Sequence, residues 1–283
     1  MTGYREESKL IMDKNAPIGV FDSGVGGLTV AREIMRQIPN ERIVYFGDTA
    51  RVPYGSKSKD NIIKFSRQII RFLQTENVKA IVIACNTASA LALDEMQQEF
   101  DLPILGVVKP GAKVAVETTA NKRIGLIGTE ANIRSGVYTR YIKSLDDEAK
   151  VFEKACPLFV PLVEEGWLHD DITLQVASRY LEELKEKDID TLIMGCTHYP
   201  LIRSTIRKVM GDKVNLVNPA YETAIELKNL LERDNLANKC DVDSPSSMYR
   251  FYVSDAEEKF KLFANSILPF DITMTKQINI ENY

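Results

Sequence analysis

Two cysteines in this sequence are each followed by small polar residues, in the segments ACNTA and GCTHY. Cys85 and Cys196 both stand where a short apolar run, typical of a buried strand, meets the start of a helical pattern. Backbone N–H groups and the helix dipole favour a thiolate at such a position. A single cysteine there would indicate a covalent nucleophile with a histidine as its base.

Two such thiols suit one class of reaction well, the inversion of a stereocentre at a C–H carbon. One group removes the proton from one face, the other returns a proton to the opposite face, and the roles exchange in the reverse direction. A thiol, whose ordinary pKa is about 8.5, can serve in either form. Cys85 and Cys196 are therefore predicted to face each other across a shared cleft and to titrate as a coupled pair.

Neighbouring side chains are candidates for adjusting the two thiols and for binding a small anion. Asp22 is placed to act on Cys85, and His198 with an acid at 164–165 is placed to act on Cys196. Hydroxyl and amide groups at strand-to-helix junctions form a ready carboxylate site. The residues that supply these groups are Ser23, Asn86, Thr87 and Thr197. Ordinary N-capping of helices is the alternative explanation for them.

The other cysteines and the second histidine are expected to have structural or solvated positions. Cys156 precedes a proline and Cys240 lies in a polar loop segment, so both are expected to be structural. His169, followed by two aspartates, is expected to be a solvated loop residue. A zinc site built on Cys196 and His198 would lack ligands, since the chain has only 2 histidines, so no metal is expected.

A nucleotide-binding interpretation is weaker. The segment GVGGLT at 24–29 resembles a dinucleotide-binding loop but lacks the third glycine of that motif. Asp48 lies roughly where a ribose-binding acid would stand, and no phosphate-binding GxxxxGK[ST] loop is present.

Apolar runs alternate with amphipathic stretches along most of the chain. The runs expected to be strands are 18–21, 43–46, 80–84, 104–108, 124–127, 158–163, 191–194, 214–217 and 249–253. The stretches expected to be helices include 61–74, 175–187 and 255–268, and 241–247 is expected to be a loop. Strand, helix, strand in repeated order predicts an α/β fold of mostly parallel sheets flanked by helices.

The chain also contains a faint internal repeat. The segment IGVFDS that begins at Ile18 resembles IGLIGT at Ile124, 106 residues later, and the two cysteine segments lie 111 residues apart. Two similar domains explain these nearly equal offsets. We predict a first domain of residues 16–108 and 220–283, a second of 109–219, an active site in the cleft between them, and a loose extension over 1–15.

Composition excludes several classes of protein. The chain has 283 residues, of which 45% are hydrophobic and 27% charged, the balance of a folded globular protein. Its net charge of −4 provides no basic footprint for nucleic acid, and no apolar run is long enough for a membrane span. The N-terminus has no signal-peptide pattern, and 4 cysteines without framework spacing fit the reducing cytoplasm.

Four motifs, in order, resemble those of the glutamate racemases, in the aspartate/glutamate racemase family. They are FDSGVGGLTV at 21–30, PYG at 53–55, ACNTA at 84–88 and GCTHYP at 195–200. The resemblance covers about 17–268, including the late segment at 252–254. The THYP ending is similar to the glutamate enzymes rather than to their aspartate-specific relatives.

This resemblance implies a cofactor-independent isomerase that interconverts L- and D-glutamate and supplies D-glutamate for bacterial peptidoglycan. It implies that Cys85 and Cys196 are the proton donors and acceptors, with Asp22, His198 and Glu165 assisting. Glu164 is the alternative for the last of these. Substrate contacts would come from Asp22, Ser23, Tyr54, Gly55, Asn86, Thr87, Thr197 and His198. The family's two similar domains usually pair as a homodimer.

Two alternatives remain open. The same thiols would serve a racemase of aspartate, of a hydantoin or of another small acid. A two-domain binding protein for a small acid would keep both cysteines as structural residues.

Overall fold

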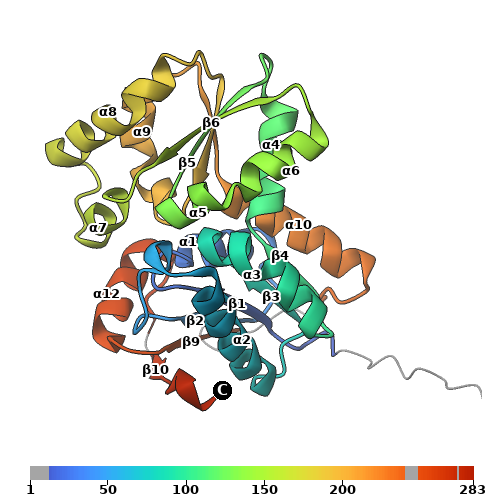
Figure 1. The fold of residues 1–283 in the computed structure, drawn as a ribbon. Helices are drawn as coiled ribbons and strands as arrows, with labels where there is room; N and C mark the ends of the chain where they lie inside the picture. The colour runs from blue at the N-terminus through green and yellow to red at the C-terminus, as the bar shows by residue number, and fades with distance from the viewer. Residues whose placement is uncertain (1–12, 240–247, 273) are drawn as a thin grey trace, which may run out of the picture.

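The computed structural model describes residues 13–239, 248–272 and 274–283, which form two parallel sheets with helices around them (Figure 1). The larger sheet has the strand order β10-β9-β2-β1-β3-β4, and the smaller has the order β6-β5-β7-β8. The strands are β1 Ile18–Asp22, β2 Ile43–Gly47, β3 Ala80–Ile83, β4 Ile104–Gly106, β5 Arg123–Gly128, β6 Lys150–Ala155, β7 Thr191–Gly195, β8 Asn215–Val217, β9 Tyr249–Val253 and β10 Lys276–Gln277. The predicted fold class is therefore confirmed.

Helices cover both faces of each sheet. On the larger sheet, α1, α10 and α12 pack into one core, and α2 and α3 pack into the other. On the smaller sheet, α7, α8 and α9 share one core, and α4 and α6 share the other. The helices are α1 Leu28–Gln37, α2 Lys59–Thr75, α3 Asn86–Glu99, α4 Val108–Thr118, α5 Glu130–Ser135, α6 Val137–Leu145, α7 Phe159–Glu164, α8 Asp171–Lys185, α9 Arg203–Met210, α10 Pro219–Arg233 and α12 Glu257–Ile267, with short 3₁₀ helices η1 Tyr54–Ser56, η2 Tyr199–Ile202 and η3 Ile280–Asn282.

The internal repeat corresponds to a repeated strand arrangement. The order β2-β1-β3-β4 in the larger sheet matches β6-β5-β7-β8 in the smaller one. Ile18 pairs with Ala80, and Ile124 pairs with Thr191, so equivalent partners lie 106 and 111 residues apart. The central strands are apolar throughout because both of their faces are buried; Val20 belongs to one core and Phe21 to the other.

The structure corrects two of the predicted elements. Residues 158–163 are not a strand, because α7 occupies Phe159–Glu164. A short apolar run does not separate helix from strand, and Pro161 within it argued against a strand. The sequence prediction also missed β6, an edge strand that contains three charged residues and has no fully buried one. Residues 1–12, Cys240 and the predicted loop at 241–247 lie outside the described residues.

A buried ion pair joins the starts of two strands in the larger sheet. Lys79 Nζ, just before β3, lies 2.5 Å from Glu41 Oε2, just before β2, and the two side chains are 0% and 3% exposed. The same ammonium donates to the carbonyl oxygens of Lys14 at 2.6 Å and Leu236 at 2.8 Å. This pair therefore ties both strand starts to the chain that follows α10.

Replacing one partner of this pair is expected to destabilise the protein strongly. Glu41→Gln leaves the buried ammonium without its counter-charge, a loss of about 3–5 kcal/mol in the free energy of unfolding. Glu183→Gln removes an exposed ion pair with Lys154 and is expected to cost less than about 1 kcal/mol. Urea denaturation of both variants measures the difference, and equal small losses would contradict the role given to the buried pair.

Candidate active site

The repeated strand arrangement places the two thiols at equivalent positions. Phe21 pairs with Ile83 in one sheet, and Ile127 pairs with Met194 in the other. Cys85 follows Ile83 by two residues and is the N-cap of α3, and Cys196 follows Met194 by two residues at the end of β7. Both thiols are buried, at 5% and 6% exposure.

Cys85 lies beside an acid and a hydroxyl. Its Sγ is 3.7 Å from Ser23 Oγ. Burial and the negative charge of Asp22 raise the pKa of Cys85 to about 12. Asp22 is itself completely buried, and burial raises its pKa against the opposing effect of His198 and of backbone N–H groups, among them that of Gly24 at 3.0 Å. Cys85 therefore rests as a neutral thiol.

Cys196 has a different partner, a histidine held by a glutamate. Sγ of Cys196 lies 3.7 Å from His198 Nδ1, and Nε2 of the same ring lies 3.1 Å from Glu164 Oε1. Burial alone would lower the pKa of His198, but the contacts with Cys196 and Glu164 raise it to about 10. The hydrogen bond from His198 lowers the pKa of Glu164. A cationic imidazole beside a sulfur stabilises negative charge on it.

The expected second acid is displaced by one residue. Glu164, not Glu165, reaches the histidine ring. Glu164 is the last residue of α7 and is partly buried, whereas Glu165 is the C-cap residue and its side chain is exposed. One residue of helix rotates a side chain by about 100°, so only one of two neighbours can face His198.

We call the part of the chain around the larger sheet and the part around the smaller sheet the two halves. Polar side chains from both halves meet around the thiols. Tyr138 donates from its hydroxyl to Asn86 Oδ1 at 2.7 Å, and the hydroxyls of Thr87 and Thr129 are 3.0 Å apart. Each pair joins α3 of the larger-sheet half to the segment that follows β5 in the other half. The predicted Asn86 and Thr87 thus lie at the junction of the two halves.

Further contacts bring the first glycine-rich loop against the second cysteine segment. Thr197 Oγ1 lies 3.5 Å from Asp22 Oδ1, and Thr29 donates from its hydroxyl to the Thr197 carbonyl at 2.9 Å. A Cβ built on Gly26 would lie 2.4 Å from Thr197 Oγ1 and 2.5 Å from the His198 ring. Only glycine permits this approach, so the loop fixes the place of both side chains.

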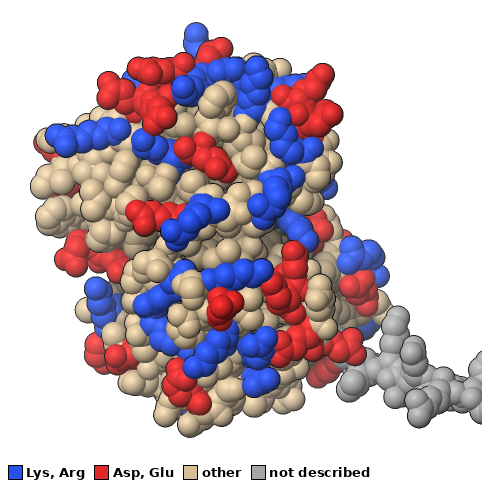
Figure 2. All heavy atoms as spheres, viewed as in Figure 1, with Lys and Arg blue, Asp and Glu red and all other residues tan. Residues whose placement is uncertain are grey.

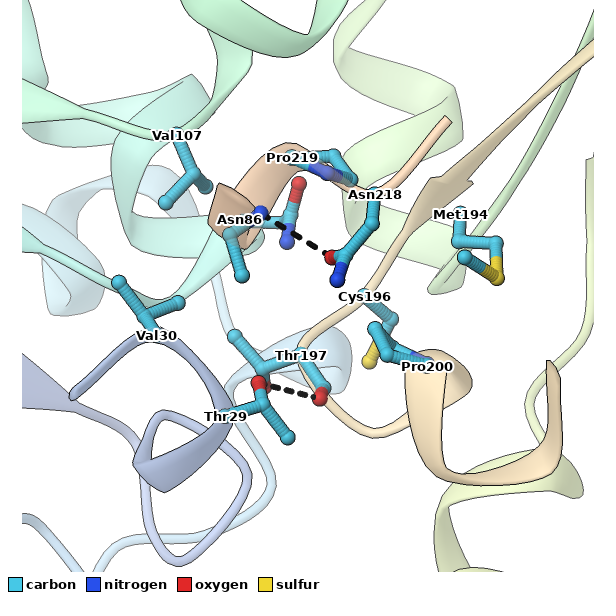
Figure 3. Close-up of a pocket in the computed structure, with 11 residues that line it drawn as sticks. Thr29, Val30, Asn86, Val107, Met194, Cys196, Thr197, Pro200, Asn218 and Pro219 are labelled. Atoms are coloured by element: carbon cyan, nitrogen blue, oxygen red, sulfur yellow. Dashed lines mark hydrogen bonds between the residues drawn. The ribbon is translucent and has the colours of Figure 1, made fainter. Parts of the chain in front are cut away.

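A small pocket lies beside Cys196, with walls from both halves (Figure 3). The lining residues are Thr29, Val30, Asn86, Val107, Met194, Cys196, Thr197, Pro200, Asn218, Pro219 and Ala220. Figure 3 shows the Thr29 hydroxyl directed toward Thr197, with Asn86 and Cys196 bordering the same space. Asn86 of the first cysteine segment and Cys196 and Thr197 of the second thus line one small pocket, which Cys85 does not line.

Tyr54 does not present its side chain to this region. Its hydroxyl donates to Asp48 within the larger-sheet half, and the side chain is 1% exposed. Gly55 instead approaches the other half, since a Cβ built on it would lie 2.9 Å from Thr129 Cβ. Of the predicted pair, the backbone rather than the phenol is available near the site.

Sequence reasoning missed three residues of this arrangement, Thr29, Thr129 and Tyr138. Thr129 was within reach, because the 106-residue offset makes it the equivalent of Ser23. The other two carry no sequence signal, since their importance arises from contacts between the halves. His169 is exposed beside Ser204, as expected of a solvated loop residue. Cys156 is buried with its thiol near the Lys154 carbonyl, as expected of a structural cysteine.

Comparisons with known proteins agree with this geometry. The family model described as Asp/Glu/Hydantoin racemase matches residues 18–225. The chain belongs to this racemase family. It is 44% identical over 264 residues to the glutamate racemase of Geobacter metallireducens, covering 93% of this chain and 97% of that one.

Solved structures of this racemase family resemble the fold closely. A glutamate racemase isoform from Bacillus anthracis superimposes with a TM-score of 0.89 at 39% identity, over 94% of this chain and 98% of that one. The glutamate racemase of Francisella tularensis, solved in complex with D-glutamate, gives a TM-score of 0.88 at 38% identity, over 95% and 100%.

Other kinds of site find little support in the described part of the chain. No group of three or more His, Cys, Asp or Glu side chains there is arranged to hold a metal ion. No described helix combines the length and apolarity that a membrane crossing requires. On the face shown in Figure 2, basic and acidic side chains are interspersed, whereas a nucleic-acid-binding face gathers cations.

The pairing of His198 with Glu164 predicts a matched pair of variants. His198 is expected to titrate near pH 10, and Glu164→Gln should lower that midpoint by at least one unit because the ring loses its anionic partner. Glu165→Gln should leave it unchanged. NMR of the ring protons measures this directly, since the chain has only 2 histidines. An equal shift in both variants would contradict the assignment of Glu164.

Proposed function

We propose that this chain interconverts L- and D-glutamate without a cofactor, using Cys85 and Cys196 as the two acid/base groups. The observation that carries the proposal is the placement of two buried thiols at equivalent strand ends of a repeated fold, each with its own polar partner. The relatives named above as glutamate racemases support glutamate as the substrate.

The two thiol environments define the resting state of the proposed reaction. Glu164 accepts a hydrogen bond from Nε2 of His198, which directs Nδ1 at Cys196 and lets the ring take the thiol proton. Cys196 then removes Hα from one face of the substrate. Cys85, kept neutral by burial and by Asp22, donates its proton to the opposite face of the carbanion.

Proton balance follows from this exchange. Each turnover leaves Cys196 as the thiol and Cys85 as the thiolate, which is the state required for the reverse reaction. Before the next turnover in the same direction, Cys196 must lose one proton and Cys85 must gain one, through solvent or through the neighbouring His198 and Asp22. Each enantiomer therefore has its own base, Cys196 for one and Cys85 for the other.

Substrate carboxylates are proposed to bind at the start of α3 and along the facing segment. Asn86 and Thr87 occupy the first turn of α3, where unpaired backbone N–H groups favour an anion. Ser23 and Thr197 supply hydroxyls on either side. Hydrogen bonds that strengthen as charge develops on the α-carboxylate would lower the barrier to proton removal.

We further propose that the site lies in the cleft between a first domain of residues 16–108 and 220–283 and a second of 109–219. The mechanism requires reduced thiols, and Cys85, Cys156 and Cys196 are free, which supports work in the cytoplasm. The family resemblance supports a homodimer and the supply of D-glutamate for peptidoglycan.

Proton exchange with solvent tests the reaction itself. L-Glutamate incubated with the purified protein in D₂O, without added cofactor, is expected to lose its Hα signal in proton NMR while D-glutamate appears on chiral analysis. A parallel tube contains aspartate. Persistence of the glutamate Hα signal at saturating protein would sink the proposal, and loss of the aspartate signal alone would indicate a racemase of a different acid.

Single thiol variants test the division of labour. Cys85→Ser and Cys196→Ser are each expected to lower racemisation by at least about 10³-fold in both directions, since one proton partner is lost. Each variant should still exchange Hα of one enantiomer only, and the two variants should select opposite enantiomers. Cys156→Ser is the matched control and should retain turnover. Exchange of both enantiomers by one variant would contradict one thiol per face.

A further inference from the structure

The loop between β2 and α2 is held by a completely buried carboxylate. Asp48 accepts hydrogen bonds from the Tyr54 hydroxyl, from Arg51 Nε at 2.7 Å and from Ser254 Oγ at 2.9 Å. Its side chain is 0% exposed, so its charge depends on these partners. Two of the donors lie within the loop itself, and Ser254 directly follows β9. The carboxylate of Asp48 therefore holds residues 51–56 in their conformation.

Arg51 extends this network to the end of the chain. Its Nη1 donates to Gln68 Oε1 at 2.6 Å and to Glu281 Oε1 at 3.2 Å, while Gln68 Nε2 donates to Glu281 Oε2 at 3.2 Å. The guanidinium carbon lies 4.1 Å from the centre of the Phe65 ring. A planar cation that binds a buried acid on one edge and a C-terminal acid on another links the two rigidly.

The last residues of the chain are themselves anchored. β10 pairs with β9 through Lys276 and Gln277, and Ile280 is 3% exposed in the core beneath α2. The Tyr283 ring stands edge-on to Phe72 with centroids 5.4 Å apart. Figure 1 shows this C-terminal end lying beside α2 and β10. We call residues 276–283 the C-terminal strap.

We propose that the C-terminal strap positions the substrate-binding backbone at Tyr54 and Gly55, with Glu281 and Arg51 as positioning residues. The inference rests on the proposed function, because the family resemblance implies that Tyr54 and Gly55 contact the substrate in the same site. Neither residue has a contact with Cys85 or with Cys196 among those that the structure gives.

The route from strap to site is short. Tyr54 is fixed at its hydroxyl by Asp48 and at its ring by Phe65, with ring centroids 5.6 Å apart. The next residue, Gly55, is the one that approaches Thr129 of the other half. Loosening Arg51 therefore displaces Gly55 relative to Thr129 while leaving both thiols in place. Such a change weakens substrate binding more than it slows the chemical step.

The kinetic test compares two glutamates of similar exposure. Glu281, whose side chain is 56% exposed, pairs with Arg51, whereas Glu183, at 60%, pairs with Lys154 in the other half. Glu281→Gln is expected to raise KM for glutamate about threefold with kcat within twofold, and Glu183→Gln should change neither. Arg51→Lys keeps the positive charge but loses the planar guanidinium group that contacts several acceptors at once, and it should raise KM about tenfold.

Two additional measurements separate positioning from general destabilisation. Adding Glu281→Gln to Arg51→Lys should raise KM no further, because both changes break one chain of contacts. Hydrogen exchange of amides 51–57, measured without glutamate, should accelerate in Glu281→Gln and Arg51→Lys and stay unchanged in Glu183→Gln. Partial unfolding would instead lower the apparent kcat and leave KM as it was.

The results of these measurements distinguish a failure of the strap proposal from a failure of the proposed function. Unchanged exchange of 51–57 in both variants overturns the strap, and so does faster exchange with an unchanged KM. If the wild-type protein fails to racemise glutamate, the proposed function fails. In that case unchanged exchange overturns the mechanical link as well, whereas faster exchange preserves the link and removes its assignment to glutamate binding.

Discussion

The placement of the two cysteines depends on one constraint. In each of the two parallel sheets, a central strand pairs with its neighbour in the same way. Phe21 with Ile83 and Ile127 with Met194 are equivalent pairs, so a cysteine two residues beyond Ile83 or Met194 arrives at the same place in each half. Carboxyl ends of parallel strands are where α/β folds bind ligands. Two halves that face each other with these ends together would bring the thiols into the one site that the proposed reaction requires.

Symmetry of position is combined with asymmetry of surroundings. Cys85 lies beside Ser23 and near the buried Asp22, and burial and the charge of Asp22 raise the pKa of its thiol. Cys196 instead lies against the ring of His198. If both thiols had the same partner, both would hold or release their protons together. In the proposed reaction, this difference supplies one acid and one base. Glu164 completes the difference, because it orients the ring and favours its cationic form.

The sequence was sufficient to predict the fold class and the position of two cysteines after strand ends, because both depend on local pattern. Strands buried on both faces, such as β1, read as continuous apolar runs, and β9 was predicted at its observed bounds. The edge strand β6 was missed, since partial burial removes the apolar signal. Glu164 was confused with Glu165 because the sequence does not reveal the rotation at the end of α7.

Other parts of the candidate site were beyond sequence reasoning for a different reason. Tyr138 touches Asn86 from the other half, and Tyr54 turns its hydroxyl to Asp48 rather than toward the thiols. Both facts depend on how distant segments pack, and no periodicity or motif encodes the direction of one side chain. Thr129 is the exception, because the repeat maps it onto Ser23.

The contacts between the halves also bear on how a substrate enters. Thiols that are 5% and 6% exposed are beyond the reach of glutamate unless the halves separate. The bonds that join them near the site are single hydrogen bonds between side chains, such as Thr87 with Thr129 and Tyr138 with Asn86. Each is worth only about 1 kcal/mol net, so these hydrogen bonds by themselves oppose opening weakly. In the proposed reaction, closure around the substrate would restore Asn86 to its partner and exclude water from the thiols, which strengthens every charge interaction in the site.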